Sequence, residues 1–117
     1  MITGKSIIGQ SWSTNESKTF KTFDPIKNEE NEWTFCEASA AEIEEACTLA
    51  NDAFKTFRTS SNQKRANFLR TIAQEMEALG DDLLGVYQKE SGLPVGRANG
   101  ELRRTCLLYT SPSPRDA

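Results

Sequence analysis

Histidine is absent from this chain of 117 residues. Its absence removes the commonest general base and a frequent zinc ligand, so the sequence predicts neither a histidine-based catalytic triad nor a histidine-containing zinc site. No apolar run approaches the roughly 20 residues of a membrane-spanning helix, and the N-terminus lacks the apolar core of a signal peptide. We therefore expect a cytoplasmic protein without a membrane partner.

Cysteine and basic charge are also scarce. The chain has only three cysteines, Cys36, Cys47 and Cys106, and this odd number without close pairing is typical of a reducing compartment. The formal net charge is -3, so the chain has no excess of positive charge to bind phosphate groups, which argues against a nucleic-acid partner. At this length the chain forms one domain at most.

The clearest pattern that is present predicts an amphipathic helix over residues 39–58. Ser39 and Glu42 have the spacing of a capping box, in which each side chain accepts a hydrogen bond from the other residue's backbone N–H. An apolar stripe then recurs at helical spacing, made of Ile43, Ala46, Cys47, Ala50, Ala53, Phe54 and Phe57. Because such a stripe needs a partner surface, we expect this helix to lie at the centre of the core.

Residues 5–38 are expected to form strands. The run from Ile7 to Trp12, with a turn signal at 9–11, predicts a tight hairpin. A strand over 19–23 should end at Asp24-Pro25, and a second strand should cover 33–38, with Trp33 and Phe35 on one face. The charge run at 28–32 predicts a solvated loop between them. A calcium site is disfavoured because glycine and regular ligand spacing are missing.

Residues 39–105 are expected to be helical, which makes the fold class α+β. After the helix at 39–58, a second helix should run over 63–79, with Ser60 and Gln63 as its capping box and Gly80 as a left-handed C-cap. A shorter helix should end at Gly92. A fourth should begin near Pro94 and carry Arg97, Glu101 and Leu102.

No residue is predicted to be catalytic, cofactor-binding or metal-ligating. Cys36 and Cys47 are expected to be structural thiols, because no base lies near them in sequence. Lys64, Arg65 and Arg70 could form an anion site, but a solvated helix face is favoured. Gly92, Gly96 and Gly100 recur every fourth residue, which indicates helix packing and not the G-x-G-x-x-G spacing of a phosphate cradle.

The last twelve residues, 106–117, differ in character from the rest. Pro112 and Pro114 forbid a helix there, and the segment looks like a translated transposon adaptor from sequencing-library preparation. We expect residues 106–117 to be a non-native tail and the natural reading frame to continue after Thr105. The alternative is a genuine Pro/Ser-rich linker.

Residues 2–105 resemble the N-terminal end of the aldehyde dehydrogenase superfamily. The features that match, in the family's order, are the hairpin Ile8-Gly9-Gln10-Ser11-Trp12, the turn Phe23-Asp24-Pro25, the helix positions Ala46, Ala50, Ala53 and Phe54, the positions Arg65, Leu69 and Ile72, and the segment Glu90-Ser91-Gly92-Leu93-Pro94. That segment departs from the usual Glu-Thr-Gly-Lys-Pro. Together with residues 96–101 and Arg104-Thr105, it is similar to the subgroup that oxidises 2-oxoglutarate semialdehyde (2,5-dioxovalerate dehydrogenases).

The resemblance implies that residues 1–105 are the N-terminal part of the cofactor-binding domain of a larger α/β enzyme. Such a parent is a homo-oligomer that oxidises a small-molecule aldehyde to a carboxylic acid with NAD or NADP, using a cysteine nucleophile and a glutamate. In the family these residues, and the cofactor loop, lie beyond the position of Thr105. Cys36, Cys47 and Cys106 do not match the nucleophile's motif. The chain alone is therefore expected to be inactive and to bind no cofactor.

The alternative hypothesis is a small acidic helical module that binds a protein partner through the stripe of residues 39–58. A module should unfold in one sharp cooperative transition in urea, whereas a fragment should give a broad one.

Overall fold

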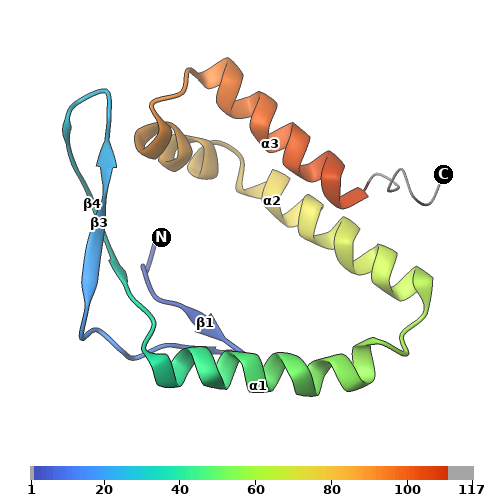
Figure 1. The fold of residues 1–117 in the computed structure, drawn as a ribbon. Coiled ribbons are helices and arrows are strands. Elements are labelled where there is room, and N and C mark those ends of the chain that lie inside the picture. The colour runs from blue at the N-terminus through green and yellow to red at the C-terminus, as the bar shows by residue number, and fades with distance from the viewer. Residues whose placement is uncertain (1, 111–117) are drawn as a thin grey trace. The chain divides into compact units, whose positions relative to one another are not determined.

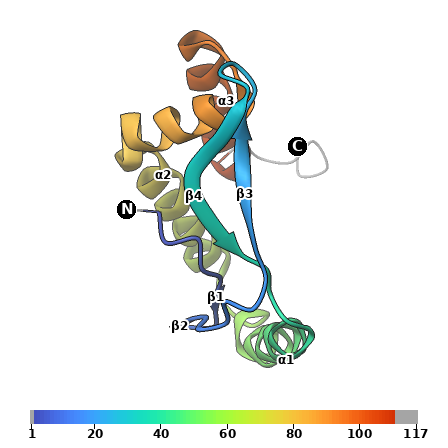
Figure 2. The same ribbon diagram turned by 90° about the vertical axis from the view of Figure 1, so that its left-hand side faces the viewer.

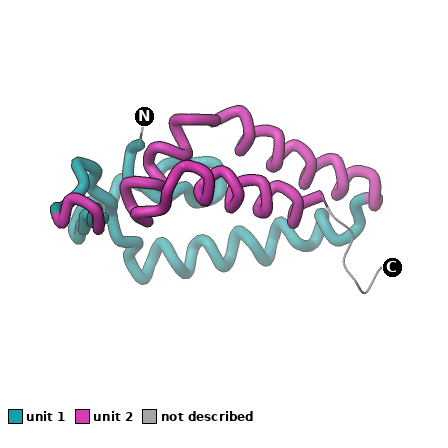
Figure 3. The backbone as a smooth tube through the Cα atoms, turned by 90° about the horizontal axis from the view of Figure 1, so that it is seen from above, with its two compact units in different colours: residues 1–23, 29–60 teal, residues 24–28, 61–117 magenta. Residues whose placement is uncertain are grey.

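The computed structural model describes residues 2–110. It contains four short strands in two small sheets and three helices, and this mixture confirms the predicted α+β class (Figure 1). The chain divides into two compact units, coloured separately in Figure 3. Within the described residues, the first unit comprises 2–23 and 29–60, and the second comprises 24–28 and 61–110. Each unit is described by itself.

The first unit opens with the predicted tight hairpin. Strand β1 (Ile7–Ile8) pairs antiparallel with β2 (Ser11–Trp12), so that Ile7 lies opposite Trp12. The two strands are joined by Gly9 and Gln10, and Gly9 has a φ of 61°. A two-residue hairpin loop needs this left-handed conformation at its first position, and glycine adopts it without a steric penalty. The prediction for residues 7–12 is therefore confirmed.

Strands β3 (Thr19–Asp24) and β4 (Glu29–Cys36) form the second two-stranded sheet. Side chains alternate along β4, with Trp33 and Phe35 partly buried and Thr34 exposed, as predicted. The ring of Phe20 stacks on that of Phe35, with centroids 5.6 Å apart. This aromatic pair joins β3 to β4.

The predicted loop at 28–32 is wrong, because Glu29–Glu32 belong to β4 and Asn31 is buried, donating from Nδ2 to Thr22 Oγ1 at 3.1 Å. The turn lies earlier, at residues 25–28. The carboxylate of Asp24 accepts from the backbone N–H groups of residues 26 and 27 at 2.9 and 3.0 Å, and this closes the turn. A charge run indicates exposure to solvent, but it does not exclude an exposed strand.

Helix α1 (Ala40–Phe57) begins as predicted. Ser39 Oγ accepts from the Glu42 N–H, and Glu42 Oε2 accepts from the Ser39 N–H at 2.8 Å. The expectation that α1 forms the centre of the core is wrong, since none of its residues is buried. Cys47, predicted as a core thiol, is exposed. Capping is a local property, whereas burial needs a partner layer that the described residues of this unit do not supply.

Helix α2 (Asn62–Ser91) belongs to the second unit. Its N-cap is Ser61, whose Oγ accepts from the Lys64 N–H at 3.2 Å, so the capping box predicted at Ser60 is wrong by one residue. Gly80 has φ 50° and ψ -129°, which is not helical, so it divides α2 into two helical segments as predicted. Its ψ lies outside the left-handed helical region, so the left-handed C-cap predicted at Gly80 is wrong. The label α2 therefore covers two helical segments that meet at Gly80.

Helix α3 (Val95–Thr110) follows a short corner. Gly92 ends α2 as predicted and is a left-handed C-cap, with φ 70° and ψ 10°, and Pro94 directly precedes α3. The helix continues five residues beyond the predicted boundary at Thr105, because no breaker intervenes before Pro112. Pro112 and Pro114 themselves lie outside the described residues.

The core of the second unit lies where α2 packs against α3. Ala73 and Leu84 of α2 and Ala98 and Cys106 of α3 are buried, and Ala98 is fully inaccessible. One buried α2 residue precedes Gly80 and the other follows it. Both segments of the broken helix therefore contribute to this core. No helix within residues 2–110 combines the length and apolarity needed to span a membrane.

Candidate functional site

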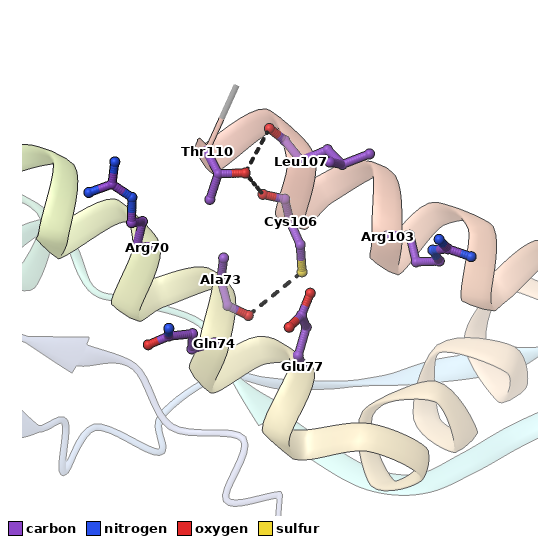
Figure 4. A pocket seen from close by; sticks show the side chains of 8 residues that line it. All are labelled: Arg70, Ala73, Gln74, Glu77, Arg103, Cys106, Leu107 and Thr110. Atoms are coloured by element: carbon purple, nitrogen blue, oxygen red, sulfur yellow. Dashed lines mark hydrogen bonds between the residues drawn. The ribbon is translucent and has the colours of Figure 1, made fainter. Parts of the chain in front are cut away.

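A pocket of about 310 Å³ lies between α2 and α3. Figure 4 shows its lining and places the guanidinium groups of Arg70 and Arg103 on opposite sides of the pocket, pointing away from each other. Two arginines that diverge in this way do not form a clamp for one anion. The remaining lining residues are Ala73, Gln74, Glu77, Cys106, Leu107 and Thr110.

Cys106 is the one thiol in this pocket. It is buried, and its Sγ donates to the carbonyl oxygen of Ala73 at 3.7 Å (Figure 4). A cysteine nucleophile needs an accessible thiolate and a nearby positive group or base. A buried thiol that donates to a backbone carbonyl has the geometry of a structural residue.

Two arginines near the start of α2 donate hydrogen bonds to asparagine side chains of the same helix. Arg65 donates to Asn62 Oδ1, and Arg70 donates to Asn67 Oδ1 at 3.3 Å. Each asparagine lies three residues before its arginine, and all of these side chains except the partly buried Arg65 belong to exposed residues. This arrangement is that of the solvated face favoured from the sequence.

A second pocket, of about 220 Å³, lies between α2 and α3 and is mainly apolar. Its one carboxylate is Glu101, which is 3.3 Å from Arg97 and 3.5 Å from Arg104. Both ion pairs are formed within α3 itself, so they hold the Glu101 side chain along its own helix. The other lining residues are Met76, Leu83, Leu84, Tyr87, Leu102 and Thr105.

In the first unit, a pocket of about 270 Å³ contains Cys36 together with an ion pair. Lys5 Nζ lies 2.8 Å from Glu16 Oε1. Their hydrogen bond, reinforced by the charge attraction, raises the pKa of Lys5 and lowers the pKa of Glu16. Lys5 therefore stays protonated and offers Cys36 no base.

Glu42 has the most strongly perturbed carboxylate among the described residues. It accepts from Ser13 Oγ, from the Ser39 N–H at 2.8 Å and from Asn15 Nδ2 at 3.1 Å. These bonds, the Ser13 bond foremost, lower the pKa of Glu42 to about 2. The carboxylate joins the loop after β2 to the start of α1, and because it stays ionised near neutral pH it is unsuited to donate a proton there.

Sequence reasoning identified Glu42 as a capping residue but missed its bonds to Ser13 and Asn15. Those partners lie 29 and 27 residues away, so no local spacing signals them. The stretch at 13–16, which contains both partners, is without helix or strand. Its orientation toward α1 depends on tertiary packing.

The described residues do not fit a dinucleotide cofactor or a metal ion. A dinucleotide cradle needs a glycine-rich turn between a parallel strand and a helix. Here α3 and its glycines follow another helix, and the paired strands β1 and β2 form an antiparallel hairpin. Within residues 2–110, no group of three or more acidic or cysteine side chains is placed to hold a metal ion.

A family model and the most similar curated proteins indicate the same family. The model described as the aldehyde dehydrogenase family matches residues 12–111. The alpha-ketoglutaric semialdehyde dehydrogenase 2 of Azospirillum brasilense is 42% identical over 105 residues, which cover 89% of this chain and 20% of the relative. The alpha-ketoglutaric semialdehyde dehydrogenase of Acinetobacter baylyi is 31% identical, over 86% of this chain and 19% of the relative.

A more distant relative has a different substrate name. The succinate-semialdehyde dehydrogenase [NADP(+)] of Saccharomyces cerevisiae is 29% identical, over 89% of this chain and 21% of that protein. The chain thus spans about a fifth of the length of the curated relatives it matches. No solved structure gives a significant match.

Proposed function

Because the chain belongs to the aldehyde dehydrogenase family, we propose that it is the N-terminal part of a longer enzyme that oxidises a semialdehyde to a carboxylic acid. The observation that carries this proposal is the 42% identity over 105 residues with a relative of which the chain spans only 20%. The parent is proposed to be a cytoplasmic homo-oligomer.

The proposed substrate is 2-oxoglutarate semialdehyde, and the proposed product is 2-oxoglutarate. Two relatives, at 42% and 31% identity, carry the name of this aldehyde, whereas the yeast relative named for succinate semialdehyde is 29% identical. The segment 90–94 supports the same choice, because it matches the subgroup pattern Glu-Ser-Gly-Leu-Pro.

The proposed cofactor is NAD or NADP, which would accept the hydride removed from the aldehyde. The yeast relative's name includes NADP(+), which supports this class of cofactor. Since the described residues do not fit a dinucleotide, we propose that it binds to parts of the parent outside this chain. The catalytic cysteine and glutamate are proposed to lie there too.

For the chain itself we propose no catalytic activity. Cys106 is buried, Glu42 is held as an anion, and Lys5 is paired with Glu16, so none of these groups is set up as a nucleophile or base. Residues 106–117 are proposed not to derive from the parent. No comparison supports the alternative of a small interaction module.

The test compares the purified chain with the full-length product of an untruncated copy of the gene. Both are assayed for formation of the reduced cofactor, with 2-oxoglutarate semialdehyde and succinate semialdehyde as substrates and each of NAD and NADP. We expect turnover by the long protein, faster with the first aldehyde, and none by the chain. Turnover by the chain alone, or an inactive long protein, would contradict the proposal.

A further inference from the structure

Asn99 is directly followed by Gly100 in α3, and it is the one asparagine of the sequence that precedes a glycine. Asparagine is among the thermolabile residues, because the backbone nitrogen of the next residue can attack its side-chain amide carbon. Glycine favours this attack, since it has no Cβ to obstruct the approach and its backbone is the most flexible. The pair 99–100 is therefore the most reactive asparagine position that the sequence contains.

The helical geometry of α3 keeps the two reacting atoms apart. Asn99 Nδ2 donates to the carbonyl oxygen of Val95 at 3.1 Å, so the side-chain amide is held toward the N-terminus of the helix. The Gly100 nitrogen lies on the C-terminal side of Asn99, and inside an α-helix its N–H donates to the carbonyl four residues earlier. A nitrogen held in this bond is a poor nucleophile. The attack therefore requires the residues around Asn99 to leave the helix.

The start of α3 has few local features that stabilise a helix. Gly96 and Gly100 both lie in its first six residues, and only proline is less favourable in a helix than glycine. The first turn holds no acidic side chain to interact with the helix dipole. α3 lies beside α2 in Figure 1 and in Figure 2, and Ala98 is fully inaccessible in this packing. Packing, more than local sequence, therefore keeps this segment helical.

We propose that Asn99 is a site of spontaneous deamidation, protected while α3 is folded and reactive when residues 95–100 open. The Gly100 nitrogen loses its proton and bonds to Asn99 Cγ, the Cγ–Nδ2 bond breaks, and ammonia leaves with that proton. Water then opens the cyclic imide at either carbonyl, which leaves an aspartate or a β-linked isoaspartate at position 99. The reaction consumes only water and is independent of the activity proposed for the parent.

The β-linked product changes the backbone within the helix core. Isoaspartate adds one carbon atom to the main chain, so the residues on its two sides no longer follow one helical repeat. Ala98 precedes position 99 and Cys106 follows it, and both are buried where α3 packs on α2. Both cannot keep their places in one regular helix, so the product should have a less stable α3.

The first test compares the folded and the unfolded chain. The whole chain is incubated in mildly alkaline buffer with and without urea, digested with trypsin, and analysed by liquid chromatography and mass spectrometry. Asn99 is the only asparagine of the tryptic peptide 98–103, so the mass of that peptide assigns the reaction. We expect deamidation at least tenfold faster in urea, because urea opens α3. Equal rates, or no product in urea, would overturn the proposal.

Two matched glycine variants separate the chemistry from the opening of the helix. Gly96 and Gly100 both lie in α3, and among the described residues a Cβ at either would have nothing within 4 Å to pack against. Gly100→Ala should slow the reaction at least tenfold in urea, because its methyl group obstructs the attacking nitrogen. Gly96→Ala leaves the reacting atoms unchanged, so it should match the wild-type rate in urea.

In buffer, Gly96→Ala should react about two- to fivefold more slowly than the wild-type chain, because alanine stabilises the closed helix. A wild-type rate for Gly96→Ala in buffer would show that the reaction does not depend on opening of α3 and would overturn the proposal. So would a wild-type rate for Gly100→Ala in urea.

The stability of the product tests the predicted damage to α3. Chromatography isolates the chain that carries isoaspartate, and its unfolding midpoint in urea should lie below that of the unmodified chain. Asn99→Asp is the matched control, because it has the same added charge with a normal backbone, and its midpoint should lie near that of the unmodified chain. An isoaspartate chain as stable as Asn99→Asp would contradict the predicted break in α3.

Discussion

The Sγ atom of Cys106 lies 3.7 Å from the carbonyl oxygen of Ala73, and both residues are at most 5% exposed where α3 packs on α2. The three cysteines therefore differ in access, since Cys47 is exposed and Cys36 is partly buried. A thiol reacts with a disulfide reagent only when the reagent can reach it.

We accordingly predict three phases of reaction with a chromogenic disulfide reagent. Cys47 should react first, Cys36 more slowly, and Cys106 only when the chain unfolds. In urea, which unfolds the chain, Cys106 should therefore react as fast as the other two. Single Cys→Ser variants assign each phase. A fast phase that disappears in the Cys106→Ser variant would contradict the packing of α3 on α2.

Ala98 provides a test of how tightly this core is packed. Its side chain is fully inaccessible, so Ala98→Leu should force neighbouring side chains apart and destabilise the chain by about 1–3 kcal/mol. The measurement is the shift in the midpoint of urea-induced unfolding. Ala78→Leu, at an exposed position of α2, should change stability by no more than about 0.5 kcal/mol.

Two glycines of the second unit should respond oppositely to alanine. Gly92 has φ 70°, and an added Cβ would lie 2.9 Å from Pro25 Cγ, so Gly92→Ala should destabilise by about 1–2 kcal/mol. Gly96 lies in α3 with open space around it, so Gly96→Ala should stabilise by about 0.5–1 kcal/mol. Thermal unfolding followed by circular dichroism measures both changes. Equal signs would show that the corner at Gly92 differs from the one described.

The hydrogen bonds of Glu42 should make the free energy of unfolding depend on pH in the acid range. Its hydrogen bonds, mainly that from Ser13, lower its pKa from 4.5 to about 2 in the folded chain. A carboxyl with a lowered pKa contributes stability above its unfolded value, and that contribution is lost as the pH falls through the folded value. The difference in stability between the wild-type chain and Glu42→Gln should therefore shrink between pH 4.5 and 2.

Ser39→Ala is the control for the Glu42 experiment. It removes the other half of the capping box and should cost about 1 kcal/mol, with no titration of its own. Its unfolding midpoint should therefore lie below that of the wild-type chain at neutral pH, while Glu42 still titrates. A constant gap between the wild-type chain and Glu42→Gln down to pH 2 would contradict the bonds drawn to that carboxylate.

Features that depend on neighbouring residues could be predicted from the sequence. The turn at Gly9, the capping box of Ser39 and the helix end at Gly92 each need only a few adjacent residues, and all three are present. The boundary between two helical segments at Gly80 is also present, but without the predicted left-handed cap.

Features that depend on a distant partner could not be predicted. The stripe of α1 has the pattern of a core helix, but its burial needs a layer that the described residues do not provide. The loop expected at 28–32 is a strand because the Asp24 carboxylate closes the turn earlier. The bonds from Ser13 and Asn15 to Glu42 span 29 and 27 residues, and no periodicity encodes them.

Because the backbone at Gly80 is not helical, the direction in which side chains of one α2 segment point does not fix the direction for the other segment. Inside a continuous helix, one inserted residue turns everything beyond it by about 100°. An insertion between Ala73 and Gly80 would therefore swing Ala73 away from Cys106, whereas one at the non-helical residue can be absorbed by its irregular backbone. Length variation among relatives in this region is accordingly expected at the break and not within either segment.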